Sequence, residues 1–263
     1  TGSKVFVIDA KGRVLRLHDE GLRFAHSAVM LSNGDVLVPD TNADRLVELD
    51  ASGKEVWTSA SWGGGTGLLS DGTRIDYPNC VQELAGGRFL LSSRYTSTVL
   101  ETDRAGKVYW SFKGAAKQHA PRRLANGNTL IADSDGGRVI EVDAAGKIVW
   151  QFSKGLRWPR FAQRLANGDT LITDSSNNRI VEVDRAGDEV FEYGRGVLSA
   201  PYQAEELEDG SILIADAQHG RLLRIGRDKR ILWKYERKPN PLARWLSLPG
   251  RLENGGAERV AGV

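Results

Sequence analysis

The chain has 263 residues, of which 40% are hydrophobic and 27% charged, so it can bury a core and does not read as a disordered segment. Its 36 Lys and Arg nearly balance its 34 Asp and Glu, and the lack of a long basic run argues against a nucleic-acid partner. No apolar run approaches about 18 residues, which excludes a transmembrane helix within this sequence. The single cysteine, Cys80, excludes an internal disulfide and a cysteine-rich metal site.

One phrase recurs along the chain. Its clearest copies are LANGNTLIAD at 124–133 and LANGDTLITD at 165–174, and weaker copies begin at Leu31, Leu84 and Leu207. Each copy is followed by an alternating apolar segment and then by an Asp-x-x-Gly turn. The glycines of five such turns are Gly12, Gly53, Gly106, Gly146 and Gly187. Internal repeats at this spacing indicate a repeat architecture.

Each repeat unit reads as four short strands. The first strand ends at the repeat leucine, and the Asn-Gly or Asp-Gly step after it favours a tight hairpin turn, because these residues accept positive φ. The Thr-Leu-Ile segment predicts the second strand, an alternating segment such as 138–143 the third, and Lys-Ile-Val-Trp the fourth. Four antiparallel strands in about 40 residues are typical of a β-propeller blade.

The two ends of the chain complete the blade count. Residues 3–17 look like the last two strands of a unit, and residues from about 246 to 263 look like the first two. We therefore predict one all-β domain over residues 1–263, a six-bladed β-propeller of four-stranded antiparallel blades. Pairing the N-terminal strands with the C-terminal strands closes the ring and removes its open sheet edges.

The repeats resemble two related propeller families. The run from Asp174 through Asn178, Arg179 and Ile180 to Gly187 resembles the NHL-type repeat. The Leu-x-Asn-Gly-Asn-Thr-Leu-Ile phrase and the Gly-Lys-Ile-Val-Trp strand resemble the propellers of bacterial arylsulfate sulfotransferases and PQQ-like repeat proteins. The resemblance covers nearly the whole chain and implies a propeller fold. Family habit further implies a periplasmic or extracellular location, whereas function is left open, because such propellers host enzymes, sensors and scaffolds.

A ring of polar residues is predicted at one end of the central channel. Strand direction puts the Asn-Gly and Asp-x-x-Gly turns on one face and the blade-to-blade connections on the other. The position five residues before each repeat leucine begins the innermost strand on the connection face. The residues at this position are His26, Asn79, His119, Arg160, Tyr202 and Ser247. The same pattern is also compatible with ordinary polar loop residues at strand starts.

The resemblance to arylsulfate sulfotransferases implies one enzymatic alternative. In that family a channel-mouth histidine accepts the sulfuryl group, and neighbouring polar side chains hold its oxygens. Here His26 or His119 would be the nucleophile and Arg160 would balance the oxyanion charge. Asn79 and Tyr202 would donate hydrogen bonds to the ligand.

A metal-dependent lyase is a weaker alternative. NHL-type lyases hold zinc through three histidines on alternate blades, and His26 and His119 are two blades apart. The third such blade carries Tyr202, which is a poor substitute for a third zinc ligand. Successive side chains of a β-strand point to opposite faces, so the Cys80 side chain is expected to point away from the face on which Asn79 lies. We therefore predict no metal site and no cofactor.

Asp and Arg recur five residues apart in four repeats, which indicates an ion-paired lock at each blade corner. The pairs are Asp40/Arg45, Asp133/Arg138, Asp174/Arg179 and Asp216/Arg221.

The second repeat departs from its siblings in two ways. Ser93 replaces the lock aspartate, and the connection before it is longer and contains the glycine-rich segment 61–67. Because broken local rules concentrate at functional positions, Trp62, Arg94 and Tyr95 are expected to contact a ligand or partner. The leading expectation is a binding or scaffolding module that engages a protein partner or a small molecule on the connection face.

Overall fold

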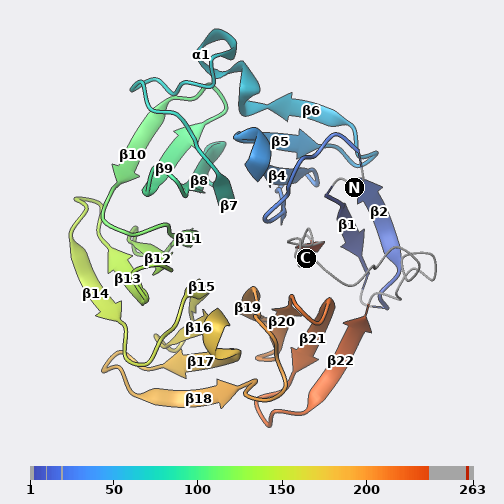
Figure 1. Ribbon diagram of the computed structural model, residues 1–263, viewed down its shortest axis with the longest axis vertical. Helices are drawn as coiled ribbons and strands as arrows, with labels where there is room; N and C mark the ends of the chain where they lie inside the picture. Colours follow the sequence, from blue (N-terminus) through green and yellow to red (C-terminus); the bar gives the residue numbers. More distant parts are fainter. Residues whose placement is uncertain (1–2, 10, 19, 237–258, 261–263) are drawn as a thin grey trace, which may run out of the picture.

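A computed structural model describes residues 3–9, 11–18, 20–236 and 259–260 of the chain. Five four-stranded antiparallel sheets and one three-stranded sheet are arranged radially around a central axis (Figure 1). We number the four-stranded sheets as blades 1 to 5. Their strands are β3 (Val29–Met30), β4 (Val36–Asp40), β5 (Arg45–Leu49) and β6 (Glu55–Thr58); β7 (Pro78–Leu84), β8 (Arg88–Ser93), β9 (Thr98–Asp103) and β10 (Val108–Phe112); β11 (His119–Arg123), β12 (Thr129–Asp133), β13 (Arg138–Val142) and β14 (Ile148–Phe152); β15 (Pro159–Arg164), β16 (Thr170–Asp174), β17 (Arg179–Val183) and β18 (Glu189–Tyr193); and β19 (Gln203–Glu206), β20 (Ile212–Asp216), β21 (Arg221–Ile225) and β22 (Ile231–Glu236).

The burial of each strand follows from its place in the blade. The second and third strands are buried on both faces, as in β12 and β13, because the neighbouring blades cover them. The fourth strand alternates between partly buried and exposed positions, as in β14. Leu90 of blade 2 shares one apolar cluster with Ile131 and Ile140 of blade 3, so the core lies between blades. The predicted β-propeller of four-stranded blades is confirmed.

The two ends of the described chain meet in the three-stranded sheet. Strand β1 (Val5–Ile8) pairs antiparallel with β2 (Val14–His18) and parallel with β23 (Arg259–Val260). The parallel direction differs from the antiparallel pairing expected there. A parallel neighbour engages the backbone groups of the β1 edge through slanted rather than perpendicular hydrogen bonds. The strand expected near residues 246–258 lies outside the described residues, as does Ser247.

The glycine-rich connection into blade 2 packs at the outer rim (Figure 1). It contains η2 (Ser59–Ser61) and the single turn α1 (Trp62–Gly65). The Trp62 side chain is 2% exposed, and its Nε1 donates to the carbonyl oxygen of Arg104 at 2.9 Å. A Cβ atom on Gly106 would lie only 2.9 Å from the Trp62 ring. The indole therefore seals the core beside an Asp-x-x-Gly turn, and this packing differs from the expectation that Trp62 contacts a ligand or partner.

Across the described residues, no helix has the length and apolar character needed to span a membrane.

Candidate functional site

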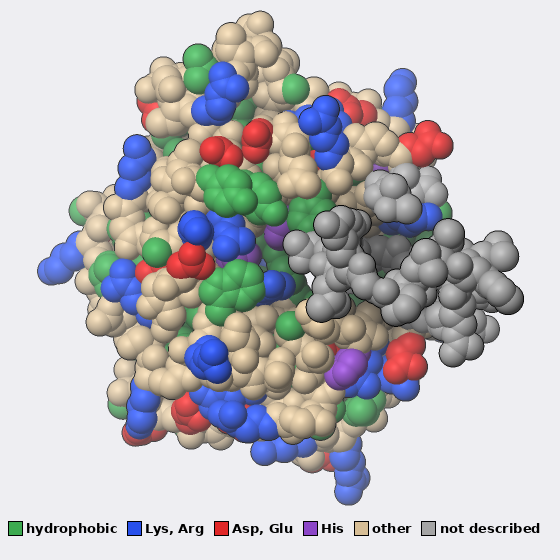
Figure 2. All heavy atoms as spheres, in the orientation of Figure 1, with side chains coloured by type: hydrophobic (Ala, Val, Ile, Leu, Met, Phe, Trp, Pro, Cys, Tyr) green, Lys and Arg blue, Asp and Glu red, His purple; other side chains and the backbone are tan. Residues whose placement is uncertain are grey.

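Three rings meet at the centre of the propeller. The centroids of His26 and His119 lie 6.5 Å apart, and the Tyr202 ring lies 6.3 Å from each of them. All three side chains are buried. His119 begins β11, whereas His26 and Tyr202 lie just before β3 and β19. Figure 2 shows histidine at the centre of this face, surrounded by hydrophobic and basic side chains. The structure thus brings together residues that lie far apart in the sequence.

Arg160 and Asn79 occupy the same register position on β15 and β7. The guanidinium carbon of Arg160 lies 4.5 Å from the Tyr202 ring centroid and 4.3 Å from that of Trp158. Asn79 is fully buried, and neither its Nδ2 nor its Oδ1 has a hydrogen-bond partner within the described part of the chain. The ring therefore combines a guanidinium, a phenol, an amide and two imidazoles.

The tautomer of His26 is set by a hydroxyl group. Its Nδ1 lies 3.1 Å from Oγ1 of Thr41, and that hydroxyl donates to the carbonyl oxygen of Pro78 at 2.6 Å. A hydroxyl has only one proton to donate, so Thr41 accepts from Nδ1–H. Nε2 is therefore the nitrogen that carries the lone pair in the neutral ring.

His119 has the same arrangement two blades away. Its Nδ1 lies 2.7 Å from Oγ of Ser134, which donates to the carbonyl oxygen of Pro159 at 2.6 Å. Sequence reasoning missed both hydroxyl residues. The available signal was their shared place directly after the repeat aspartate, where blade 5 has Ala217.

An aromatic wall surrounds the ring and was also missed. The Phe24 and Tyr77 rings pack edge-on against His26, with centroids 4.6 and 5.4 Å away. The Trp158 ring lies 5.5 Å from His119. Tyr77 and Trp158 have φ angles of 57° and 55°, a left-handed conformation that bulky residues seldom adopt. The equivalent residues before His119 and Tyr202, Lys117 and Ala200, have φ angles of 46° and 44°, so this conformation is a repeated feature of the blade connections.

Arg94 and Tyr95 lie beside this wall. Nη2 of Arg94 is 3.8 Å from Oδ1 of Asp135, and the same oxygen accepts from Nε1 of Trp158 at 2.9 Å. Tyr95 stacks on Tyr77 at a centroid distance of 4.5 Å and is 58% exposed. Both residues were singled out from the sequence, and the structure puts them next to the ring, unlike Trp62.

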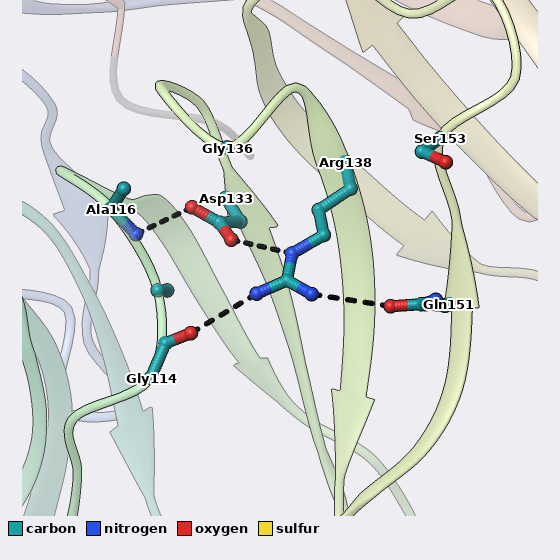
Figure 3. A pocket seen from close by; sticks show the side chains of 8 residues that line it. Gly114, Ala116, Asp133, Gly136, Arg138, Gln151 and Ser153 are labelled. Carbon is teal, nitrogen blue, oxygen red and sulfur yellow. Dashed lines mark hydrogen bonds and ion pairs between the residues drawn. The ribbon is translucent and has the colours of Figure 1, made fainter.

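The four Asp/Arg pairs have the geometry of structural locks. Figure 3 shows the one in blade 3, which lines a pocket of about 580 Å³. One carboxylate oxygen of Asp133 accepts from the backbone N–H of Ala116, and the other accepts from Nε of Arg138 at 2.7 Å. The guanidinium also donates to the carbonyl oxygen of Gly114 and to the side chain of Gln151. The pocket is therefore lined by groups that already hold one another and tie the blade to the preceding connection.

In blade 2 a hydroxyl replaces the lock. Oγ of Ser93 accepts from the backbone N–H of Asp76 at 2.9 Å and from Oγ1 of Thr96 at 2.7 Å. Because Ser93 is uncharged, this corner does not need an arginine five residues later to neutralise a carboxylate. Arg94 belongs to the neighbouring rim network instead.

No group of three or more His, Cys, Asp or Glu side chains suited to a metal ion occurs among the described residues. Within that part of the chain, the two ring histidines do not acquire a third ligand of these types.

The fold and the ring define a β-propeller with a buried polar cluster where its innermost strands begin. The family model described as outer membrane protein assembly factor BamB matches residues 1–154, 43–211 and 135–256. The chain therefore belongs to this family, and the PQQ-like repeats expected from the sequence are confirmed. None of the curated proteins compared with the chain matches it.

Solved structures share the fold at low sequence identity. A protein of unknown function from Bacteroides caccae is 16% identical, with a TM-score of 0.67 over 95% of this chain and 90% of that one. A streptogramin B lyase is 18% identical, with a TM-score of 0.61 over 84% of this chain and 70% of that one. The catalytically inactive histidine-to-alanine variant of virginiamycin B lyase from Staphylococcus aureus, with quinupristin, is 16% identical, with a TM-score of 0.61 over 84% and 72%.

Proposed function

We propose that the protein binds a small ligand in the polar ring on the connection face of its central channel. The observation that carries this proposal is the buried meeting of His26, His119 and Tyr202 with Arg160. Arg160 suits an anionic group, and the two imidazoles suit hydrogen bonding to a polar group. The aromatic wall suits an apolar or aromatic part. Concave sites with a few convergent polar groups are the usual form of ligand pockets.

Isothermal titration calorimetry with small aromatic anions tests the proposal. Arg160→Gln removes the positive charge at the ring and is expected to weaken binding about tenfold or more, because hydrogen bonds to charged groups contribute most. His219→Gln is the matched control, since His219 pairs with Asp216 in the outer loop of blade 5. Equal losses in both variants, or no binding by the wild type, would contradict the proposal.

A histidine-based transfer reaction is a second candidate, favoured by the hydroxyl groups that fix each Nδ1–H. Nε2 of His26 or His119 would attack the sulfur of an aryl sulfate, and the S–O bond to the aryl group would break with its electron pair leaving on the phenolate. An acceptor phenol would then take the sulfuryl group from the histidine, and its proton would pass to solvent. The similarity to arylsulfate sulfotransferases in the repeats supports this candidate, as does the role of a histidine in the structurally similar lyase.

The transfer reaction is tested with an aryl sulfate donor and a phenol acceptor. Turnover by the wild type that is lost in the folded double variant His26→Ala/His119→Ala supports it. Equal turnover by the two proteins rejects it while leaving the binding proposal standing.

The family description also supports a protein partner and a periplasmic location for this chain. The exposed Tyr95, stacked on Tyr77 and next to Arg94, has the composition of an interface core. Cell fractionation and capture of partners with wild-type protein and with Tyr95→Ser test these two points. A cytoplasmic chain, or a partner whose capture does not depend on Tyr95, would contradict them.

A further inference from the structure

Asn79 holds a buried amide whose hydrogen-bonding capacity is not used within the described residues. Its exposed fraction is 0%, and both Nδ2 and Oδ1 lack a hydrogen-bond partner there. Nearly all buried polar side chains in folded proteins are paired, because an unpaired one loses its hydrogen bonds to water without replacement. Asn79 differs from the other described side chains that have an unpaired buried atom, such as Thr173, because both of its polar atoms are unpaired, and this makes the amide available to a group from outside the chain.

The surroundings of Asn79 show where that group would lie. Asn79 stands in blade 2 at the repeat position that His26, His119 and Tyr202 hold in their own blades. The rings of these three residues lie close together. Its backbone is fixed by Oγ of Ser27, which donates to the Asn79 carbonyl oxygen at 2.9 Å. The two residues before it, Tyr77 and Pro78, contact His26 and Thr41, so Asn79 lies next to the candidate ligand site.

The chemistry of an amide restricts the ligand. Asn79 presents one acceptor and two donor hydrogens side by side, so it is fully satisfied by a group that also offers an acceptor beside a donor. An N-acylated amino acid does so with its N–H and its own carboxyl oxygen, which lie on the same side of an extended residue, whereas the C=O and N–H of a single trans amide point in opposite directions. A sulfate or phosphate dianion offers only acceptors and would leave Oδ1 of Asn79 without a partner. The buried amide thus favours an amide-bearing ligand over a simple oxyanion.

We propose that the channel mouth recognises an N-acylated amino acid, or the C-terminal residue of a peptide, with an aromatic side chain. Asn79 accepts from the N–H through Oδ1 and donates to the carboxylate through Nδ2, Arg160 also holds the carboxylate, and the wall formed by Phe24, Tyr77 and Trp158 receives the aromatic ring. This assignment rests on the proposed binding function and names its ligand class. The guanidinium of Arg160 is well placed for the carboxylate, because the Tyr202 and Trp158 rings hold it at the ring.

Three matched probes separate the contributions of the ligand groups by calorimetry. N-acetyl-L-phenylalanine carries the amide, the carboxylate and the aromatic ring. 3-Phenylpropionate lacks the amide, and N-acetyl-L-phenylalaninamide lacks the carboxylate. We expect the complete probe to bind about tenfold more tightly than either partial one, which is the effect of one lost hydrogen-bonded group. Equal affinity for the complete probe and 3-phenylpropionate overturns the ligand class and leaves the binding function intact. Absence of binding by all three probes, and by aryl sulfates, overturns both.

Substitution of Asn79 gives a second, independent readout. Asn79→Leu removes the unsatisfied amide at similar volume, so the unliganded protein is expected to melt at a higher temperature while affinity for N-acetyl-L-phenylalanine falls about tenfold. Affinity for 3-phenylpropionate is expected to stay the same.

Thr173→Val is the matched control, because its Oγ1 is also buried without a partner but lies in the core of blade 4. It is expected to change neither affinity. Asn79→Ala keeps the test valid if leucine does not fit, since it also removes the amide. A lower melting temperature with unchanged affinity in both Asn79 variants would assign the residue a purely structural role and overturn the inference.

Discussion

Nδ1 of His119 lies 2.7 Å from Oγ of Ser134, and this hydroxyl reaches the carbonyl oxygen of the next blade's first strand. Since Ser134 can give its only proton to that carbonyl, the imidazole must donate to the serine. The same logic applies to Thr41 and His26 two blades away. A hydroxyl side chain at one repeat position, threonine in one blade and serine in the other, therefore orients both histidines and ties adjacent blades together.

Ser134→Ala is expected to remove the contact that keeps the His119 proton on Nδ1. It should also lower the free energy of unfolding by about 1 to 3 kcal/mol, since it leaves buried polar groups unpaired. The tautomer is read from the ¹⁵N chemical shifts of the imidazole, and the stability from urea denaturation. Retention of the Nδ1–H form at unchanged stability would show that the hydroxyl does not determine which ring nitrogen carries the proton.

The lock between Asp133 and Arg138 is expected to be a major contribution to stability. Asp133 is 1% exposed and accepts from both Arg138 and the backbone of Ala116, so Asp133→Ala should lower the free energy of unfolding by about 3 kcal/mol. The control is Asp228→Ala, which breaks an exposed pair with Arg230 and should cost about 0 to 1 kcal/mol. Similar melting temperatures for the two variants would contradict the structural interpretation of the pocket in Figure 3.

Glu141 is expected to make stability depend on acidic pH. Burial raises its pKa, but hydrogen bonds from Asn128, Arg185 and Asn126 and the charge of Arg164 outweigh burial, so the pKa lies below its ordinary value. A lowered folded-state pKa contributes stability that is present above the unfolded value of about 4.3 and is lost as the pH falls through the folded value.

Glu141→Gln removes that contribution. The difference in unfolding free energy between wild type and variant should be about 2 kcal/mol at neutral pH and should shrink below about pH 4. Guanidinium denaturation across the acidic range measures it. A difference that is constant with pH would show that Glu141 is not the linked group.

Removal of residues 1–17 is expected to open the ring. Val5 and Val7 of β1 pack in one cluster with Val38 and Val47 of blade 1, and β1 also pairs with β23. The shortened chain should aggregate or unfold, because it exposes a sheet edge and an apolar face. Size-exclusion chromatography with light scattering decides; a monomer with the wild-type melting temperature would contradict closure through the N-terminal strands.

The fold was predictable because the same pattern of strands and turns recurs along the chain. The phrase ending at Asp133 recurs at Asp174, and each copy encodes the same buried strand and turn. Alignment of the repeats also placed His26 and His119 at equivalent positions, which the structure brings together. Register, unlike side-chain packing, can be read from a sequence.

Other features depend on contacts between blades and were missed. Thr41 and Ser134 act through carbonyl groups of the following blade, and neither residue type signals that role by itself. Trp62 sits in a glycine-rich segment that reads as an open loop, yet its ring is buried against Gly106, over 40 residues later. The parallel direction of β23 likewise left no pattern in the sequence.

The central claim is that the polar ring is a ligand site, and the four histidines of the chain test it directly. His26 and His119 lie in the ring, whereas His18 contacts the carbonyl oxygen of Gly53 and His219 contacts Asp216. Imidazole NMR spectra of ¹⁵N-histidine-labelled protein, titrated with N-acetyl-L-phenylalanine and with 4-nitrophenyl sulfate, report on all four at once. We predict that at least one ligand shifts the His26 and His119 resonances and leaves those of His18 and His219 in place. Four unchanged resonances at saturating ligand, or shifts confined to His18 and His219, would contradict the assignment of the site.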